Sequence, residues 1–183
     1  MNDLQKVFTK KNLIILKDLS SKNESYIREI SENTDASPAQ VHQAIKIFKK
    51  LGFIKEKRLK NKKILSIKRD NLLLSKLRQL INIYDMANHK SFKELTKHGI
   101  VGIYGSFAAG KDTPQSDIDM WIYAKNHADA VELRKITRKI ETDFKKEVKL
   151  LLLTDEKIKS LKEIDPEFYF RLKLTSEGED IFD

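Results

Sequence analysis

The sequence predicts an α+β protein in two parts joined by a helix, and three observations support this. Residues 1–70 carry apolar residues at helical spacing, followed by two short strand patterns. Residues 99–183 alternate apolar strand patterns with amphipathic helices. Residues 1–70 hold 17 Lys and Arg against 8 Asp and Glu, whereas residues 99–183 hold 14 against 17. We therefore predict domains at 1–70 and 99–183, with residues 71–98 as a helical connector.

Composition narrows the possible classes of protein. The chain has 183 residues, of which 40% are hydrophobic, and a formal net charge of +9. It contains no cysteine, which excludes disulfides and Cys-ligated zinc. No apolar run approaches the roughly 18 residues of a membrane span, and the first residues lack the basic-then-apolar layout of a signal peptide. We expect a cytoplasmic protein without membrane association.

Residues 1–52 predict three helices. The first is expected from Leu4 to Leu19, and the second is a short helix around Ser25–Ile30. The third begins with Ser37 as N-cap, proline at the first helical position and Gln40 closing a capping box. Gly52 is expected to end that helix.

A basic hairpin follows the third helix. Strands are expected at Phe53–Arg58 and Ile64–Lys68, around a lysine-rich turn. Residues 49–69 hold ten basic residues and a single acid, Glu56. Three helices followed by a basic hairpin resemble a winged helix-turn-helix domain across residues 10–70, and this resemblance implies DNA binding.

Candidate DNA-binding residues follow from the helical periodicity. If Val41, Ala44 and Phe48 face the core, polar residues on the opposite side of the third helix face outward. Amides can contact base edges and lysines can contact phosphates. The alternative is a protein-contact or dimerisation domain with a solvated basic face. The predicted DNA-binding residues are Gln40, Gln43, Lys46 and Lys50 on the helix, and Lys60, Lys62 and Lys63 on the hairpin.

The connector is predicted to be mainly one long helix, from Leu72 to about His89. Leu73, Leu77, Leu80 and Tyr84 fall on one side of it. This side is equally compatible with packing on the chain's own domain and with a homodimer seam, since two-fold proteins suit palindromic DNA sites. A second, short helix is expected to begin with a capping box at Ser91.

The main chemical signal lies between residues 105 and 119. Gly105-Ser106 interrupts an apolar strand at 100–104, and Asp117 and Asp119 begin the next one. Residues i and i+2 of a strand share a face, so the two carboxylates are expected to project side by side and to bind Mg²⁺. The Gly-Ser turn can present N–H groups and a hydroxyl to phosphates. This combination predicts transfer of a nucleotidyl or phosphoryl group.

The rest of the C-terminal part is expected to complete a small sheet. A helix carries apolar residues from Val131 to Phe144, and a third strand follows at Glu147–Leu153. The last two helices are expected to begin at Thr154 and at Asp165-Pro166. Trp121 and Tyr123 share the face of the aspartates, where they would either stack on a base or pack on the sheet.

The motif Gly-Ser-Phe-Ala-x-Gly, followed by Ser-Asp-Ile-Asp, resembles the minimal nucleotidyltransferases of the DNA polymerase β-like superfamily. The resemblance is close over residues 99–153. It implies a small mixed sheet flanked by helices and Mg²⁺-dependent nucleotidyl transfer from ATP or another nucleoside triphosphate. It further implies that Gly105 and Ser106 hold the triphosphate and that Asp117 and Asp119 bind the metal ions.

The chain departs from this family pattern at two positions. Ala109 stands where many members have arginine, and Lys111 is a candidate to replace that charge at the phosphates. The family usually has a third carboxylate on the strand after the helix, where Lys149 stands here. Glu147, two residues earlier on the same face, is the candidate third catalytic acid. If it does not serve, the lysine would neutralise the Asp pair or contact a phosphate.

The leading hypothesis is a nucleotidyltransferase tethered to DNA, with a protein hydroxyl, an RNA end or a small molecule as acceptor. The alternative is a DNA-binding transcriptional regulator or antitoxin whose nucleotidyltransferase domain is inactive and only binds nucleotide or a partner.

Overall fold

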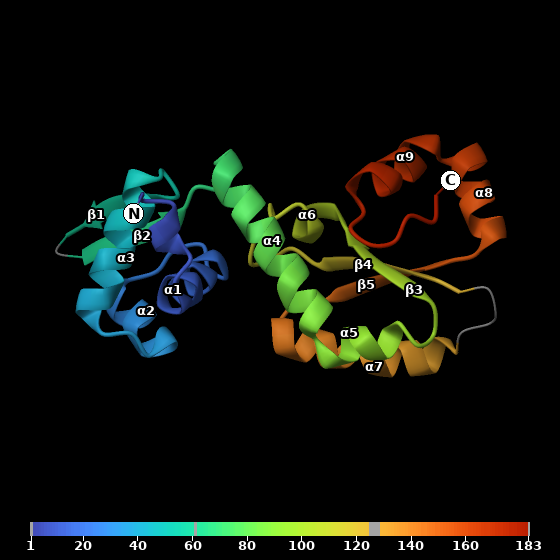
Figure 1. Ribbon diagram of the computed structural model, residues 1–183, viewed down its shortest axis with the longest axis horizontal. Coiled ribbons are helices and arrows are strands. Elements are labelled where there is room, and N and C mark those ends of the chain that lie inside the picture. The colour runs from blue at the N-terminus through green and yellow to red at the C-terminus, as the bar shows by residue number, and fades with distance from the viewer. Residues whose placement is uncertain (1, 61, 125–128, 183) are drawn as a thin grey trace. The chain divides into compact units, whose positions relative to one another are not determined.

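The computed structural model describes residues 2–60, 62–124 and 129–182. The chain forms two compact units, Met1–Leu74 and Ser75–Asp183 (Figure 1). The mixture of helices with small sheets confirms the predicted α+β class, and the sheet of the second unit is flanked by helices as expected. No helix in the described ranges combines the length and hydropathy of a membrane span.

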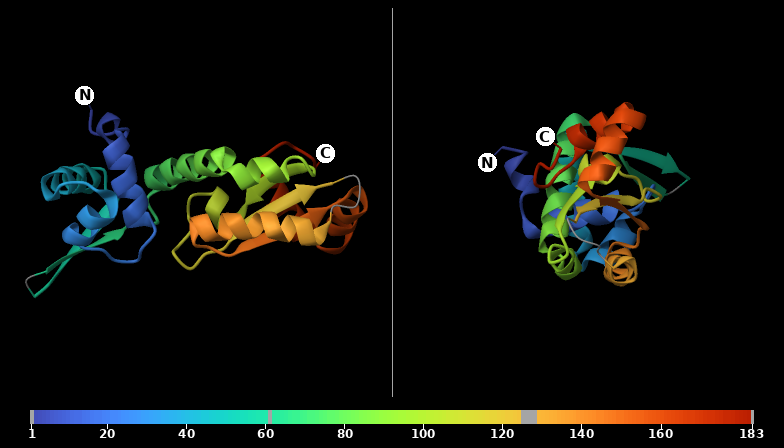
Figure 2. Two further views of the ribbon diagram at one scale, coloured as in Figure 1. Left: turned by 90° about the horizontal axis from the view of Figure 1, so that it is seen from below. Right: turned by 90° about the vertical axis from the view of Figure 1, so that its right-hand side faces the viewer.

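The first unit consists of helices followed by a hairpin. A 3₁₀ turn, η1 (Gln5–Val7), precedes the helices α1 (Lys10–Ser20), α2 (Ile27–Thr34) and α3 (Pro38–Lys50). The strands β1 (Ile54–Leu59) and β2 (Lys62–Ile67) pair antiparallel, with Leu59 opposite Lys62. Figure 2 shows this hairpin extending away from the three helices. Its tip residue Asn61, part of the predicted basic turn, lies outside the described residues.

Helix capping explains where the helices of this unit begin. The predicted capping box at Ser37 and Gln40 is present and opens α3. The predicted single helix over Leu4–Leu19 is wrong, because it is divided at Thr9. The Thr9 hydroxyl accepts a hydrogen bond from the backbone N–H of Asn12 and so caps a new helix at Lys10. The apolar faces of α1 and α3 meet in a core that includes Leu16, Val41 and Phe48.

The helix α4 (Leu72–Asn88) matches the long helix predicted there. Of the four residues predicted on one side of it, Leu77 is buried, whereas Leu73, Leu80 and Tyr84 are exposed. The homodimer seam therefore stays a prediction.

The second unit is built on a three-stranded mixed sheet in the order β3-β4-β5. β3 (Ile100–Tyr104) and β4 (Ile118–Tyr123) are antiparallel, whereas β4 and β5 (Val148–Leu153) are parallel. The short helix α6 (Gly105–Ala108) connects directly to β3, and α7 (Ala130–Phe144) connects β4 with β5. The remaining helices are α5 (Lys90–Leu95), α8 (Asp155–Ile164) and α9 (Pro166–Thr175).

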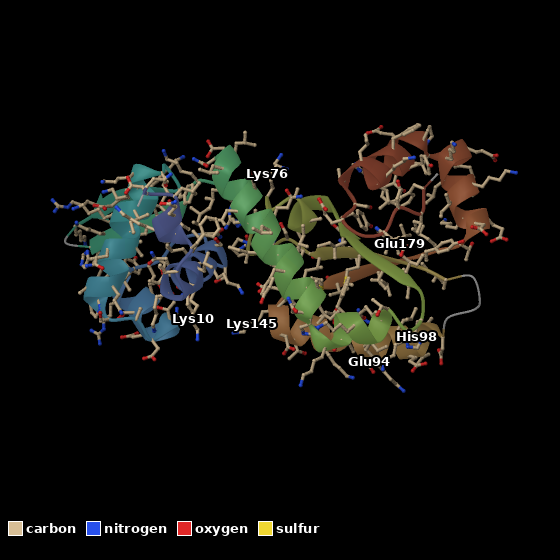
Figure 3. The ribbon with its side chains drawn as sticks, in the orientation of Figure 1. Lys10, Lys76, Glu94, His98, Lys145 and Glu179 are labelled. Atoms are coloured by element: carbon tan, nitrogen blue, oxygen red, sulfur yellow. The ribbon has the colours of Figure 1, made fainter. Side chains whose placement is uncertain are left out.

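Helices cover both faces of this sheet (Figure 1). On one face, Leu133, Ile136 and Ile140 of α7 pack against Ile118 and Met120 of β4. On the other face, residues of α9 and of the C-terminal segment surround Trp121. The α5 region lies along α7, where Glu94 pairs with Lys139 and His98 lies 3.9 Å from Glu132 (Figure 3).

The predicted N-cap of α5 at Ser91 is wrong by two residues. The helix begins at Lys90 with His89 as N-cap, and His89 Nδ1 accepts a hydrogen bond from the Ser91 N–H. Ser91 is buried inside the first turn. The predicted caps at Thr154 and Asp165 are confirmed, since each side chain accepts a backbone N–H of the helix that follows.

Candidate active site

Strand register places three polar side chains in one row across the sheet. Tyr104 of β3 lies opposite Asp119 of β4, and Asp119 lies beside Lys149 of β5. Side chains of directly paired residues project from the same face of a sheet. This is the face that α9 covers farther along the strands, and Asp117 lies immediately before β4 at the end of the row. The predicted aspartate pair therefore lies at the N-terminal end of the central strand β4, beside a lysine and a tyrosine.

The Gly105-Ser106 turn lies against this row. Gly105 has φ +71° at the junction of β3 and α6, a conformation that L side chains rarely adopt. A Cβ atom on Gly105 would lie 2.5 Å from Asp119 Oδ2, so the Asp119 carboxylate would have to move to make room for it. The structure thus brings together the predicted phosphate-binding turn and one of the predicted metal ligands.

Lys149 neutralises part of the negative charge of the aspartate pair. Its Nζ lies 2.5 Å from Asp117 Oδ2. The hydrogen bond to Asp117 raises the pKa of the Lys149 ammonium. Burial raises the pKa of the Asp119 carboxyl, an effect that the charges of Lys149 and Arg171 oppose and that of Asp117 reinforces. The site is a compact arrangement of two carboxylates and cationic groups.

The third predicted acid does not join the pair. Glu147 is exposed and precedes β5, and its backbone carbonyl accepts a hydrogen bond of 2.8 Å from Ile118 N–H. Among the described residues, no three His, Asp or Glu side chains are grouped closely enough to hold a metal ion. The structure therefore brings together Asp117 and Asp119 without a third grouped acid, whereas the charge of Glu147 acts on Lys149.

The other predicted nucleotide ligands lie within α6 and just after it. Ser106 is partly exposed in its first turn, and its carbonyl accepts a hydrogen bond from Lys111 N–H at 2.9 Å. The Lys111 side chain is exposed. Ala109 ends α6 as its C-cap. The backbone of Lys111 is thus hydrogen-bonded to the turn, and its ammonium group lies at the end of a long, exposed side chain.

Arg171 of α9 belongs to the site but was not among the predicted residues. Its guanidinium carbon lies 5.4 Å from the centre of the Phe168 ring, and that ring packs edge-on against Tyr104. Burial and the charge of Asp119 raise the pKa of Tyr104, and the charge of Arg171 partly opposes this rise. No sequence pattern links residue 171 to residues 104–119, because only the packing of α9 brings them together.

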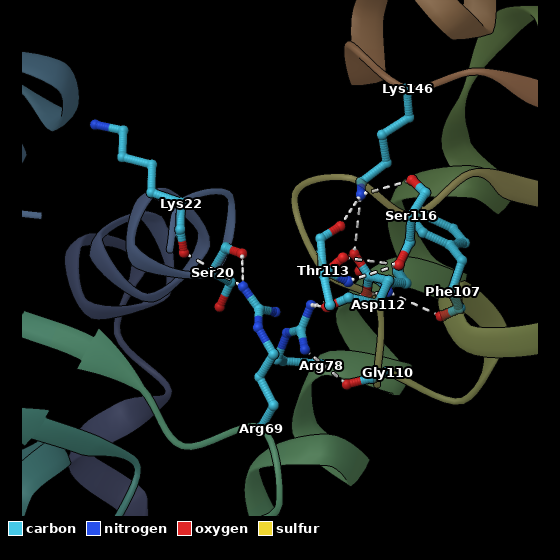
Figure 4. A network of polar contacts seen from close by, with 11 residues as sticks. Ser20, Lys22, Arg69, Arg78, Phe107, Gly110, Asp112, Thr113, Ser116 and Lys146 are labelled. Atoms are coloured by element: carbon cyan, nitrogen blue, oxygen red, sulfur yellow. Dashed lines mark hydrogen bonds and ion pairs between the residues drawn. The ribbon is translucent and has the colours of Figure 1, made fainter. Parts of the chain in front are cut away.

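A buried polar network holds the loop that leads to the aspartates (Figure 4). The Arg78 guanidinium donates to the Gly110 carbonyl at 2.9 Å and to Asp112 Oδ1 at 2.7 Å. Asn82 Nδ2 also donates to Asp112 Oδ1, and Lys146 Nζ lies 3.4 Å from Asp112 Oδ2. The side chains of Arg78 and Asp112 are 5% and 7% exposed. This network ties α4 and the segment before β5 to the loop that ends at Asp117.

Lys146 makes the second connection of the network. Its Nζ donates to the Ser116 carbonyl at 3.0 Å and to the Thr113 carbonyl. The Thr113 N–H in turn donates to Ser116 Oγ at 2.9 Å. The backbone just before Asp117 is thereby held in place from two sides.

The two aromatic residues on the aspartate face have structural roles. Trp121 is fully buried, and its Nε1–H donates to Ser176 Oγ at 3.0 Å. The Tyr123 hydroxyl donates to Asp155 Oδ1 at 2.6 Å. Of the two predicted roles, packing on the sheet is the one the structure shows.

The predicted DNA-binding residues of the first unit are exposed. Gln40 Oε1 accepts the Ser37 N–H in the capping box. Lys50 lies 3.7 Å from Asp3, and Lys63 lies 3.6 Å from Glu56. Lys62 Nζ lies 5.8 Å from the Tyr26 ring centre. Such exposed ion pairs are weak. The remaining predicted residues, Gln43, Lys46 and Lys60, are exposed on α3 and at the end of the hairpin.

One protein family matches part of the second unit. Residues 88–167 match the family described as "Polymerase beta, Nucleotidyltransferase". These residues contain the row of Tyr104, Asp119 and Lys149, the Gly105 turn and Asp117. This match agrees with the nucleotidyltransferase resemblance of the sequence motif. The match covers less than half of the chain. No curated protein matches the chain significantly.

Solved structures show weak likenesses. A possible transcriptional regulator for arsenical resistance is 13% identical, with a TM-score of 0.35, and the match covers 53% of this chain and 95% of that one. The tri-AMPylated Shewanella oneidensis HEPN toxin in complex with MNT antitoxin gives 15% identity, a TM-score of 0.36 and coverages of 55% and 70%. A toxin-antitoxin structure with AMP-PNP is 16% identical, with a TM-score of 0.36, and the match covers 50% of this chain and 71% of that one.

Proposed function

We propose that this protein is a Mg²⁺-dependent nucleotidyltransferase tethered to DNA, using ATP or another nucleoside triphosphate. The observation that carries the proposal is the approach of Gly105 to Asp119, where a Cβ atom would lie 2.5 Å from the carboxylate oxygen. This close approach supports binding of the triphosphate at the Gly105 turn and of its Mg²⁺ ion at the neighbouring Asp119. The match of residues 88–167 to nucleotidyltransferases supports the class of reaction.

The aspartate pair fits one Mg²⁺ ion. Mg²⁺ is usually bound through one or two carboxylates together with substrate phosphates, and it keeps several of its waters. Asp117 and Asp119 offer such carboxylates beside the phosphate-binding turn. When bound there, the ion would offset the negative charge of the triphosphate. The same residues do not fit a second ion, because no third acid joins the pair among the described residues.

The chain's own groups have separate roles in the proposed reaction. Gly105 and Ser106 bind the triphosphate through N–H groups and the hydroxyl, and Lys111 contributes charge. The acceptor hydroxyl oxygen forms a bond to the α-phosphorus as the bond to the β-phosphate oxygen breaks. Pyrophosphate leaves with that electron pair, and the hydroxyl proton passes to water. The acceptor classes remain a protein hydroxyl, an RNA end and a small molecule.

DNA tethering is proposed for the first unit. It rests on the clustering of ten basic residues within residues 49–69 and on the exposure of the α3 and hairpin lysines. A duplex contacted by these lysines would be bound mainly through its phosphates.

The test of transfer uses ATP labelled in the α-phosphate, Mg²⁺ and cell lysate as the source of acceptor. The wild type is expected to transfer label, and Asp117→Asn with Asp119→Asn to abolish transfer. A matched control removes two exposed acids from the helices, Glu163→Gln with Glu167→Gln. Labelling that survives the Asp117/Asp119 double substitution would show that the proposed site does not carry the reaction.

A second candidate function is a DNA-binding regulator or antitoxin whose nucleotidyltransferase domain binds nucleotide without transferring it. The observation that favours it is the ion pair of Lys149 with Asp117 at 2.5 Å, in the place of the family's third acid. Here the Asp117/Asp119 double substitution should leave DNA binding largely intact. Robust metal-dependent turnover by the wild type would reject this candidate.

A further inference from the structure

The position of Lys149 distinguishes this site from a two-metal site. β5 runs parallel to β4, and the register sets Lys149 directly beside Asp119. The Lys149 ammonium lies 2.5 Å from Asp117 Oδ2. The lysine is thus in contact with one member of the pair and in register with the other. A third carboxylate at this position would extend the pair into a three-acid cluster.

Charge decides what this position can hold. Two metal ions about 3.5–4 Å apart are held by shared anionic ligands on both sides. Here the side facing β5 carries an ammonium group. A second divalent ion at that point would meet repulsion from Lys149 instead of a ligand. Lys149 is exposed, and the charge of Glu147 also acts on it, but among the described residues no third acid is grouped with Asp117 and Asp119.

We propose that Lys149 is the cation on the β5 side of this site and replaces the second divalent ion. The site then holds a single divalent ion, which arrives with the triphosphate. This proposal rests on the proposed nucleotide site and specifies its metal content. It also makes Lys149 the residue that neutralises the aspartate pair when no nucleotide is bound.

The first experiment counts bound ions. Mn²⁺ is titrated into the full chain and followed by its electron paramagnetic resonance signal, with a triphosphate analogue bridged by methylene between the α- and β-phosphorus. Such an analogue lacks the bond that nucleotidyl transfer breaks. We expect one Mn²⁺ per chain in the wild type and two in Lys149→Asp. Two ions in the wild type, or one in a Lys149→Asp chain with bound analogue, would overturn the proposal.

The matched control is Lys135→Asp, with the same change of charge. Lys135 is an exposed residue of α7, the helix that covers the opposite face of the sheet. This variant should retain the wild-type count of one ion. A gain of a second ion in this control would show that net charge, and not the position of Lys149, sets the count, and it would also overturn the proposal.

The second experiment needs no nucleotide. Lys149→Met removes the ammonium and keeps much of the side-chain length, which favours correct folding. Mn²⁺ affinity of the nucleotide-free chain should rise about thirtyfold, because a unit charge is removed within about 4 Å of a divalent ion at an exposed site, which is worth about 2 kcal/mol in water. Lys135→Met should leave the affinity unchanged. Equal affinities for the wild type and Lys149→Met would refute the role of Lys149.

The two experiments separate the failure of this inference from failure of the proposed function. A wild-type chain that does not bind the triphosphate analogue contradicts the proposed function. The Mn²⁺ affinity of Lys149→Met still decides whether Lys149 occupies a cation position beside the aspartates.

Discussion

Gly105 offers a sharp test of the site, because replacing it with alanine has two separable effects. Gly105 has φ +71°, and Gly52 after α3 has φ +70°. Alanine at either position incurs the strain of the left-handed region, about 1–2 kcal/mol. At Gly52 the new Cβ atom would meet only the Asn71 side chain, at an ordinary 3.4 Å. At Gly105 it would lie 2.5 Å from Asp119 Oδ2, so that this carboxylate must move.

The required displacement sets the expected size of the functional effect. Ordinary contact begins at 3.4 Å, so Asp119 Oδ2 must retreat by about 1 Å. A misplacement of this size costs on the order of 100-fold in rate. We therefore expect Gly105→Ala to lower nucleotidyl transfer about 100-fold and Gly52→Ala to leave it unchanged. Both variants should unfold at lower temperature, by roughly 4–8 °C per kcal/mol for the unit that carries the substitution.

The assay compares both variants by transfer of α-labelled ATP, by Mn²⁺ binding with the methylene-bridged analogue, and by thermal unfolding. The Mn²⁺ measurement keeps the comparison informative if the natural acceptor is missing from the lysate. The reasoning is refuted if Gly105→Ala binds Mn²⁺ and the analogue as tightly as Gly52→Ala does. That result would mean that the position of the Asp119 carboxylate does not matter for the site.

Three further predictions follow from the charges of the structure. Burial raises the pKa of Asp119 in the folded state, so its contribution to stability is lost as pH rises through that pKa. Asp119→Asn should therefore raise the melting temperature at pH 7, by more than at pH 4, and an equal shift at both would contradict this. Arg78→Met should lower the free energy of unfolding by about 1.5–3 kcal/mol in urea titrations, because buried Asp112 loses one of its two cations and keeps Lys146. Adding Asp112→Leu should recover part of the loss. The third prediction concerns a variant with alanine at Lys60, Lys62 and Lys63. Fluorescence anisotropy should show that its slope of log DNA affinity against log salt concentration is smaller than that of the wild type, by up to about 3. An unchanged slope would exclude phosphate contacts by the replaced side chains.

Features coded within a few residues were predictable from the sequence. The caps at Ser37, Thr154 and Asp165 depend only on a side chain and an N–H three residues later. Competition between neighbouring local signals was harder to resolve. The predicted first helix is divided at Thr9, because the Thr9 hydroxyl caps a new helix that begins at Lys10. Apolar periodicity alone did not reveal this cap. His89 displaced Ser91 as a cap, since an imidazole nitrogen can accept the same kind of hydrogen bond.

Features that depend on distant parts of the chain were not predictable. Arg78 and Asp112 are 34 residues apart, and neither belongs to a motif. Their contact becomes visible only when α4 packs beside the loop before β4. Arg171 reaches the neighbourhood of Tyr104 only through the packing of Phe168. The sequence motif thus predicted the groups proposed to contact nucleotide, whereas the groups that hold them in place required the structure.

The choice between Lys149 and Glu147 as the neighbour of Asp119 is a question of strand register. A shift of β5 by two residues would keep the same faces and bring Glu147 beside Asp119. Two contacts oppose that shift. Leu153 is fully buried at the far end of β5, and Lys146 is bonded to the Ser116 carbonyl just before its start. Because Lys146 also lies 3.4 Å from the buried Asp112, the shift would remove a cation from a buried carboxylate. The network that positions Asp117 is therefore also what keeps a lysine, and not an acid, beside Asp119.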